Sequence, residues 1–373
     1  MTYPSPLQSK LETFTIEIER HHHEARREGA ATGEYHPQLL CEFLPWGNTG
    51  CDILATTGIV ELEYAAIQKS AGLFDAPCRG TVELRGNDRL SFIDRMSTQK
   101  LTDLKEGESR LAFVINRKGS IIADVVVRNL QDRVLIDLDI SVVEQLCNHF
   151  KSYTVMDDVT FEDITERVHW LWCVGPQAPS QDREGVEVYS LPHDLLGIDG
   201  TAIAVKPDQA GDVWQSLVEE EVRPIGWYAL NMARVENGAA IFLIDFDCEN
   251  LPHETNLIQS RVRFDKGCYL GQEIVARMEN LGKPKRILMK LRMQTDDLPV
   301  AGSQLWEDSS AKGTPVGVVT SSAISPKGGS QPAVIVMVGK KHAPENTTLY
   351  VYVGTKIVEG TVAPLLNIKE YPE

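Results

Sequence analysis

The sequence has no pair of cysteines in a C-x-x-C arrangement, although it contains seven cysteines among its 373 residues. Zinc and iron–sulfur sites built from one local cysteine cluster use such close spacings. The odd number of cysteines, in a long chain without a recognisable secretory signal, also argues against a disulfide framework. We therefore expect no permanently bound metal. We interpret the adjacent His21, His22 and His23 as exposed surface, because neighbouring helical positions point in different directions.

Long apolar runs and a secretory leader are missing as well. The longest clean apolar run, residues 333–338, is far shorter than a membrane span. The first residues, MTYPSPLQSKLETF, show no basic region followed by an apolar one. We expect a cytoplasmic protein with no membrane contact and, by default, a monomer.

Positive charge is scarce in this chain. It has 37 Lys and Arg residues against 53 Asp and Glu residues, which gives a net charge of −16. Such a surface mostly repels a phosphate backbone, so we expect no direct nucleic-acid binding. We interpret the local basic run of Lys283, Lys285, Arg286 and Lys290 as the solvated start of a strand.

Dinucleotide-binding, P-loop and G-x-S-x-G motifs are absent, and the signals that are present predict an α+β protein. Residues 79–86 alternate apolar and polar side chains as a half-buried strand does. Residues 109–116 and 120–127 predict two strands joined by a turn that ends at Gly119. Residues 141–153 predict a helix with Ser141 as its N-cap and Glu144 completing a capping box.

The chain divides into four predicted parts. Residues 1–57 form an N-terminal extension, and residues 58–165 and 166–284 form two α+β domains with a ferredoxin-like arrangement. Residues 285–373 contain short strands separated by Gly, Pro and Ser, which predicts a small β-barrel or sandwich.

Cys268 is the first candidate for chemistry, in DKGCYLGQEIVAR (residues 265–277). Gly267 and Gly271 allow tight turns, Lys266 could favour the thiolate, and a helix starting near Gly271 would favour it further. The alternative is a free thiol packed as a small buried hydrophobe, which is the commonest use of cysteine. The residues alone favour that alternative.

Three further residues carry charge in predicted elements. Asp124 shares a strand face with Ile122 and Val126, so it is either a buried carboxylate that needs a partner or ligand, or an exposed one. Arg234 and Glu236 lie two apart on a predicted helix and therefore face different ways. A buried positioning role is one interpretation for them, and ordinary surface charge is the favoured one.

The segment KGCYLGQEIVAR (residues 266–277) resembles the K-G-C-[FY]-x-G-Q-E signature of the YgfZ family of folate-binding, T-protein-like proteins. Residues 71–75 (AGLFD), 249–257 (ENLPHETNL) and 314–322 (TPVGVVTSS) are similar to further segments of that family. The resemblance implies two α+β units and a C-terminal β-barrel, arranged as three domains in a ring around a folate channel.

The resemblance implies one of two activities. YgfZ-type proteins act in iron–sulfur cluster assembly or repair, with indirect effects on iron–sulfur tRNA-modifying enzymes. Their partners would be folate and iron–sulfur client or assembly proteins. The T-protein relatives are tetrahydrofolate-dependent aminomethyltransferases. We take the YgfZ-type function as the leading hypothesis, aminomethyl transfer as the alternative and a non-catalytic interaction scaffold as the third. Whether the protein is an enzyme is left open.

The same resemblance assigns site residues. Cys268, Lys266 and Asp124 are expected to be catalytic, and Asp124, Tyr269, Gln272, Glu273 and Arg234 to contact a bound tetrahydrofolate.

Two positions depart from the T-protein pattern: Ala202 stands where the glutamate that holds the pterin is expected, and Leu230 stands where an arginine is expected. Alanine cannot accept the pterin's hydrogen bonds, so these departures weaken the expectation of folate binding and, more strongly, of aminomethyl transfer.

Overall fold

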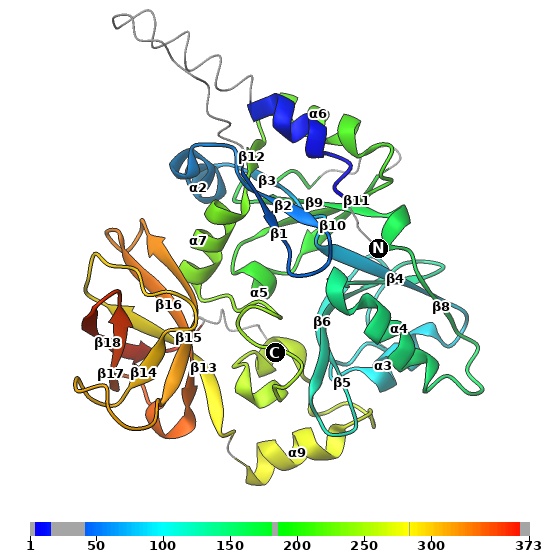
Figure 1. The fold of residues 1–373 in the computed structure, drawn as a ribbon. Helices are drawn as coiled ribbons and strands as arrows, with labels where there is room; N and C mark the ends of the chain where they lie inside the picture. Colours follow the sequence, from blue (N-terminus) through cyan, green and yellow to red (C-terminus); the bar gives the residue numbers. More distant parts are fainter. Residues whose placement is uncertain (1–3, 16–41, 181–185, 283, 366–373) are drawn as a thin grey trace, which may run out of the picture. The chain divides into compact units, whose positions relative to one another are not determined.

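The computed structural model describes residues 4–15, 42–180, 186–282 and 284–365 (Figure 1). The predicted histidine surface at residues 21–23 and part of the predicted N-terminal extension lie outside these ranges. The chain forms two compact units. Unit 1 comprises Met1–Gly80, Ile164–Leu191 and Asp199–Leu230, and unit 2 comprises Thr81–Asp163, Pro192–Ile198 and Asn231–Glu373.

Unit 1 is built on a five-stranded sheet in the order β10-β11-β9-β3-β12, in which only β3 and β12 run parallel. Its strands are β3 (Gly72–Asp75), β9 (His169–Val174), β10 (Glu187–Leu191), β11 (Gly200–Val205) and β12 (Arg223–Ile225). Helices α2 (Val60–Lys69) and α6 (Ala210–Glu219) and the hairpin of β1 (Glu42–Pro45) and β2 (Asp52–Thr56) complete the unit. Strand β3 therefore pairs with strands that are distant in the chain. Its antiparallel partner β9 follows it by about a hundred residues, and its parallel partner β12 follows later still.

The N-terminal segment is part of the unit 1 core. Leu7 and Leu11 are buried in the same apolar cluster as Trp214 of α6. Ser5 donates a hydrogen bond of 2.5 Å to the buried carboxylate of Asp75, which also lies 2.6 Å from Nε2 of His169. Because the carboxylate lies between the hydroxyl and the imidazole, this trio holds the segment to the sheet and does not activate the serine.

Unit 2 contains a second five-stranded sheet in the order β5-β6-β7-β4-β8. Its strands are β4 (Arg79–Arg85), β5 (Ser109–Ile115), β6 (Ile121–Asn129), β7 (Val134–Asp139) and β8 (Thr160–Asp163). Helices α3 (Arg89–Met96) and α4 (Val143–Lys151) pack together through a T-shaped contact between Phe92 and Phe150. All nine residues of β6 are buried, so any polar residue on this strand must find a partner inside the protein.

The C-terminal part of unit 2 is a closed six-stranded barrel in the order β13-β16-β15-β14-β17-β18, drawn in yellow to red in Figure 1. Its strands are β13 (Arg286–Met293), β14 (Gln304–Trp306), β15 (Gly317–Ser325), β16 (Gln331–Gly339), β17 (Thr348–Val353) and β18 (Lys356–Ala363). Closure removes exposed sheet edges, which explains how such short strands form a stable domain.

Short helices connect these parts. They are α5 (His193–Leu196), α7 (Trp227–Asn237), α8 (Ile258–Arg261) and α9 (Gln272–Leu281), with single 3₁₀ turns at Ile140–Val142, Thr165–Arg167, Pro252–Glu254 and Lys340–His342. None of the helices in the described ranges is long and apolar enough to cross a membrane.

The structure confirms the α+β class with a C-terminal β-barrel and the strands predicted at residues 79–86, 109–116 and 120–127. The predicted capping of the helix after residue 141 is wrong. Asp139 accepts a hydrogen bond from the backbone N–H of Ser141 and caps a short 3₁₀ turn, and α4 begins only at Val143. The Ser141 hydroxyl itself donates to the Asp139 carboxylate, so the serine acts here as a donor and not as the capping acceptor. The four-part domain boundaries remain a prediction.

Candidate functional site

Asp124 lies on β6 opposite Phe113 of β5 and is 7% exposed. Its two carboxylate oxygens accept hydrogen bonds of 2.9 and 3.2 Å from Nε of Arg261 at the end of α8. The interpretation of Asp124 as an exposed side chain is therefore wrong, and the interpretation as a buried carboxylate with a partner is confirmed. A buried carboxylate without such a partner would destabilise the sheet by several kcal/mol.

Arg261 is fully buried and each of its nitrogens has an acceptor. Nη1 donates to the Ser260 hydroxyl at 2.8 Å, Nη2 donates to the backbone carbonyl of Asp194 at 3.3 Å, and the guanidinium lies 5.7 Å from the ring centroid of Phe113. These contacts fix the orientation of the Asp124 carboxylate. Since only one N–H reaches the two oxygens, the carboxylate keeps acceptor capacity for a ligand or a proton.

Arg261 is the partner of Asp124 that the sequence did not reveal. It lies 137 positions from Asp124 in the chain. The only available signal was the aspartate itself, because a carboxylate on an apolar strand face requires a cation somewhere in the fold.

The Cys268 loop, residues 264–271, connects α8 to α9. Cys268 is exposed, so the interpretation as a buried small hydrophobe is wrong. Its neighbour Tyr269 is 7% exposed, and burial raises the pKa of the Tyr269 phenol to about 12. The loop therefore points the tyrosine inward and the thiol outward.

Lys266 is the anchor of the Cys268 loop. Its fully buried ammonium donates to the backbone carbonyls of Asp94, Ser97 and Gln99 at 2.5, 3.0 and 2.6 Å, at the end of α3. Burial lowers the pKa of Lys266 to about 8, and the Asp94 carboxylate at 3.4 Å opposes that shift. These contacts support an anchoring role for Lys266; its predicted catalytic role with Cys268 remains a prediction.

Gly271 ends the Cys268 loop and is the N-cap of α9, which confirms the helix predicted to begin there. Its φ is +79°, and a Cβ at this position would lie 2.5 Å from the carbonyl oxygen of Asn116 in the β5–β6 turn. Only glycine satisfies both conditions. Gln272 is half-buried and Glu273 is exposed in the first turn of α9, where they remain predicted folate contacts.

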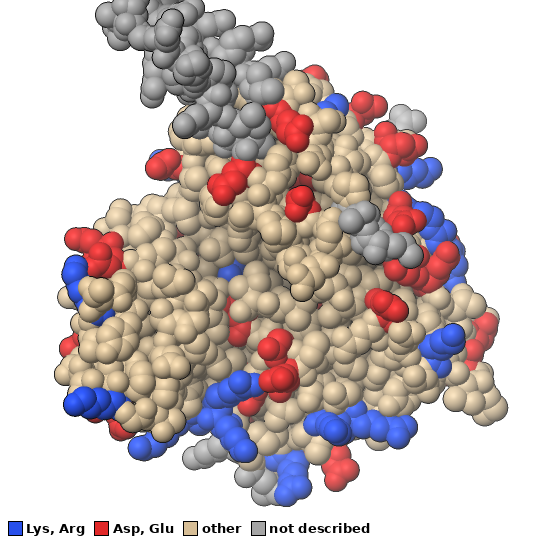
Figure 2. Space-filling view, in the orientation of Figure 1, with Lys and Arg blue, Asp and Glu red and all other residues tan. Residues whose placement is uncertain are grey.

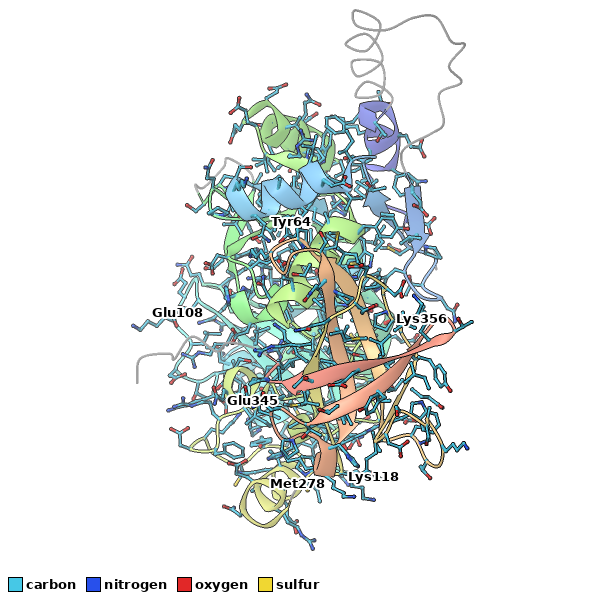
Figure 3. The ribbon with its side chains drawn as sticks, turned by 90° about the vertical axis from the view of Figure 1, so that its left-hand side faces the viewer. Tyr64, Glu108, Lys118, Met278, Glu345 and Lys356 are labelled. Carbon is cyan, nitrogen blue, oxygen red and sulfur yellow. The ribbon has the colours of Figure 1, made fainter. Side chains whose placement is uncertain are left out.

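The β5–β6 turn and α9 pack closely. A Cβ on Gly119, whose φ is +80°, would lie 2.7 Å from the side chain of Ile274. Figure 3 shows Lys118 of the turn and Met278 of α9 together at the bottom of the view. The turn, α9 and the Cys268 loop therefore form one continuous part of unit 2.

This part of unit 2 is locally basic. Arg117 and Lys118 are exposed in the turn, and Arg277 is exposed on α9. The guanidinium of Arg117 lies 5.2 Å from the ring centroid of Tyr153. Figure 2 shows Lys and Arg side chains along the lower edge of the molecule, where the turn and α9 lie in Figure 1. Cys268 lies on the loop that leads into α9, and Asp265, Glu273 and Glu279 are also exposed in this segment.

Arg234 of α7 is buried, with an exposure of 1%, so its interpretation as surface charge is wrong. Its guanidinium donates to the Asp245 carboxylate and to the Ser321 hydroxyl, both at 2.7 Å. The side chain of Glu236 is also only 7% exposed and accepts a hydrogen bond from Ser325 of the barrel. Both residues join α7 to β15, and a folate contact by Arg234 remains a prediction.

The two positions that depart from the T-protein pattern offer no polar group. Ala202 is fully buried on β11 and pairs with Trp172 of β9, and Leu230 is fully buried in α7. A pterin ring therefore cannot form a side-chain hydrogen bond at either position. In the described residues no three His, Cys, Asp or Glu side chains are grouped so that they could hold a metal ion.

The sheets and the closed barrel define a T-protein-like fold. The structure superimposes on the glycine cleavage system aminomethyltransferase T from Bartonella henselae with a TM-score of 0.77, 19% sequence identity and coverage of 87% of this chain and 93% of that chain. Residues 35–181 match the sequence profile of the GCVT N-terminal domain.

The curated relatives that the chain resembles carry the name aminomethyltransferase. That of Rubrobacter xylanophilus is 25% identical over 72% of this chain and 76% of its own length. That of Thermotoga sp. (strain RQ2) is 26% identical over 82% of this chain and 88% of its own length. The mitochondrial aminomethyltransferase of Dictyostelium discoideum is 25% identical over 79% of this chain and 81% of its own length.

Proposed function

We propose that this protein binds tetrahydrofolate and transfers a one-carbon group in the manner of an aminomethyltransferase, with Asp124 as the acid–base group. The observation that carries the proposal is the buried pair of Asp124 and Arg261. The position of Asp124 matches the catalytic aspartate expected from the resemblance, and the similar relatives are named aminomethyltransferases. The comparisons therefore support aminomethyl transfer better than iron–sulfur cluster assembly.

The pair has the properties that acid–base catalysis needs. The carboxylate is held in one orientation by Arg261, and it retains lone pairs that can accept a hydrogen bond from a folate nitrogen or take a proton during transfer. The surrounding apolar strand residues exclude water and so strengthen these interactions. Since neither Ala202 nor Leu230 can hold the pterin through its side chain, the proposal requires that Asp124 and other groups carry folate recognition.

The test is an assay with an aminomethylated lipoyl carrier protein and tetrahydrofolate. We expect formation of methylenetetrahydrofolate by the wild-type protein and a large loss in Asp124→Asn. Absence of product from the folded wild-type protein would reject aminomethyl transfer. Calorimetry with tetrahydrofolate would then show whether folate binding alone survives.

A second candidate function rests on Cys268. An exposed thiol on a loop that is anchored by Lys266 and ends at Gly271 is accessible to another protein. This arrangement suits the YgfZ-type function in iron–sulfur cluster assembly or repair, in which Cys268 would be the essential group. Full rescue of iron–sulfur enzyme activity by Cys268→Ala in a deletion strain would reject that role.

A further inference from the structure

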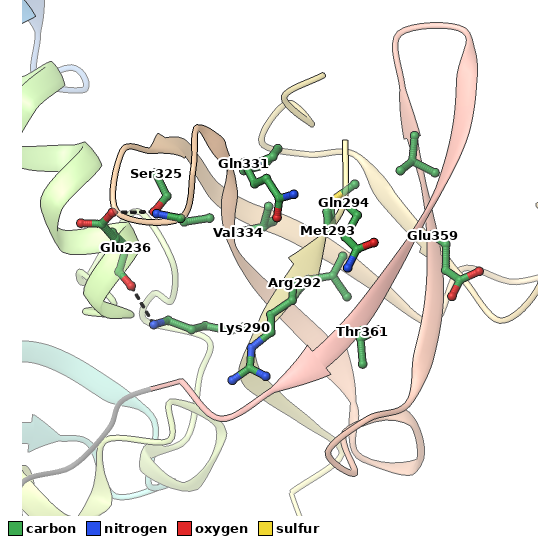
Figure 4. Close-up of a pocket in the computed structure, with 15 residues that line it drawn as sticks. Glu236, Lys290, Arg292, Met293, Gln294, Ser325, Gln331, Val334, Glu359 and Thr361 are labelled. Atoms are coloured by element: carbon green, nitrogen blue, oxygen red, sulfur yellow. Dashed lines mark hydrogen bonds between the residues drawn. The ribbon is translucent and has the colours of Figure 1, made fainter. Parts of the chain in front are cut away.

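The outer face of the barrel contains a cavity of about 800 Å³ that is separate from Asp124 and Cys268 (Figure 4). Strand β13 crosses it and presents Lys290 and Arg292 on one face, with Gln294 directly after the strand, while Leu291 and Met293 belong to the barrel core. The cavity is of the size that holds a small-molecule ligand. Its position on a rigid closed barrel means that the lining side chains are held by a fixed scaffold.

Two positive charges lie side by side in this cavity. Lys290 and Arg292 are two residues apart on β13, so their Cα atoms are separated by about 6.6 Å. The Lys290 ammonium donates one hydrogen bond of 2.8 Å to the backbone carbonyl of Glu236, which leaves two of its N–H groups. Among the described residues the Arg292 guanidinium forms no hydrogen bond and no ion pair with another side chain.

The acidic side chains of the cavity do not neutralise these cations. The Glu236 carboxylate accepts hydrogen bonds from the Ser325 hydroxyl and the backbone N–H of Lys327, and the Lys327 ammonium lies 3.8 Å away. Figure 4 shows Glu359 on the opposite side of the cavity, pointing away from Arg292. Burial and the nearby charge of Arg292 lower the pKa of Lys290, and Glu236 only partly opposes this shift. Among the described residues, Arg292 therefore forms no ion pair, whereas the charge of Lys290 is partly balanced by Glu236.

The rest of the lining suits an organic anion. Thr361 of β18 lies directly opposite Arg292, and Gln331 lies on β16 on the other side of β13. These side chains can donate further hydrogen bonds to oxygen atoms. Val334 and Val358 supply an apolar wall for a carbon skeleton.

We propose that this cavity is a binding site for a small molecule with two or more carboxylate or phosphate groups. Arg292 binds one oxyanion through two parallel N–H groups, and Lys290 binds a second as a point charge. The ligand supplies the counter-charge that Arg292 lacks and that Glu236 provides only in part for Lys290. The site is distinct from the proposed folate chemistry, because Asp124, Arg261 and Cys268 are not among the residues that line it.

The test is calorimetric titration of the full-length protein with citrate and, separately, with pyrophosphate in a low-salt buffer that contains no polyvalent anion. We expect saturable binding of at least one probe at one site, and Arg292→Gln should weaken it roughly tenfold or more, since it removes charge-assisted hydrogen bonds. Binding of citrate alone identifies carboxylates as the ligand groups, binding of pyrophosphate alone identifies phosphates, and binding of both shows that charge is selected.

Two variants make this test specific. Lys341→Gln removes an exposed lysine from a different depression of the same barrel and should change the affinity by less than about twofold, as expected for a distant exposed charge. Lys290→Gln should weaken binding like Arg292→Gln, and circular dichroism must show that both remain folded. The proposal is overturned if neither probe binds saturably at 10 mM, on the order of the weakest metabolite affinities, or if Lys341→Gln weakens binding as much as Arg292→Gln.

Discussion

Asp124 and Cys268 lie in the same unit but in opposite environments. Asp124 is buried on a central strand and its charge is paired with Arg261, whereas Cys268 is exposed on a loop and only its neighbours are anchored. A buried ionised group can be held in one geometry only if the fold supplies its partner. An exposed thiol needs no such partner, but it can react only with a molecule that binds at the protein surface. The buried environment of Asp124 therefore suits chemistry on an enclosed small molecule, and the exposed environment of Cys268 suits contact with a second protein.

The largest expected effect is that of Asp124→Asn. The substitution keeps the side-chain shape but removes the charge, so we expect the aminomethyl-transfer rate to fall about 10²- to 10⁴-fold. It also leaves Arg261 buried without a counter-ion, which should lower the free energy of unfolding by about 2–4 kcal/mol. Product formation and urea unfolding measure the two effects.

The control for Asp124→Asn is Asp137→Asn. Asp137 and Arg128 form another fully buried ion pair, at 3.4 Å, in the same sheet. This variant should lose stability to a similar extent while the remaining folded protein keeps its activity. If both variants lose activity equally, the role of Asp124 is structural and the comparison with Cys268 fails.

Lys266→Met tests the anchoring of the Cys268 loop. The substitution removes the donor for three buried carbonyls and the partner of Asp94, so we expect the free energy of unfolding to fall by about 2–3 kcal/mol. The rate at which Cys268 reacts with a thiol reagent should also change, because the loop loses its fixed shape. Urea unfolding and thiol labelling measure these effects. Arg263→Met is the matched control: Arg263 is exposed, its partner Asp265 is also exposed, and its loss should have little effect on either measurement.

His149 of α4 provides a contrasting case, a half-buried titratable group whose Nε2 has no hydrogen-bond partner among the described residues. Burial lowers the pKa of His149 to about 4 from an ordinary value of 6.5. Between these pH values the imidazole of His149 is protonated in the unfolded chain but not in the native protein. The free energy of unfolding should therefore fall as the pH falls from 6.5 to 4. We expect a loss of about 1–2 kcal/mol, less than the full shift implies because the ring is partly accessible to solvent.

The measurement for His149 is the free energy of unfolding at several pH values for the wild type and for His149→Phe. Phenylalanine keeps the ring contacts with Phe150 and Tyr153 but does not titrate. The difference between the two proteins should therefore grow as the pH is lowered through this range. Parallel stability curves would show that the ring is protonated in the native protein too.

The smallest expected effect is that of Cys268→Ser on stability. Because the thiol is exposed, we expect a change within about 0.5 kcal/mol. The wild-type thiol should react with a labelling reagent in the native state, whereas the buried Cys173 should react only after unfolding. Protection of Cys268 in the native protein would show that the exposed environment described above is incorrect.

Much of the fold was predictable because its signals are local. The alternation in residues 79–86, the Gly119 turn and the helix starting at Gly271 each depend on a few adjacent residues. The predicted Ser141 cap was wrong because Asp139 caps a 3₁₀ turn ahead of α4 and the Ser141 hydroxyl donates to Asp139. Local patterns cannot decide between such neighbours.

The site was less predictable because its partners are distant in the chain. The sequence singled out Asp124 and Cys268 but could not pair Asp124 with Arg261, 137 positions away. In the same way, Lys266 looked like a group that acts on the adjacent thiol, whereas its acceptors lie about 170 positions earlier at the end of α3. The burial of Arg234 depends on Asp245 and Ser321, which only the tertiary structure brings together.

The most direct test of the central claim is the rate of methylenetetrahydrofolate formation from an aminomethylated lipoyl carrier protein, measured side by side for the wild type, Asp124→Asn and Cys268→Ser. The account predicts product from the wild type, an undiminished rate in Cys268→Ser and a rate at least about a hundredfold lower in Asp124→Asn. An unchanged rate in Asp124→Asn, or a loss of activity confined to Cys268→Ser, would contradict it and would move the function from the buried carboxylate to the exposed thiol.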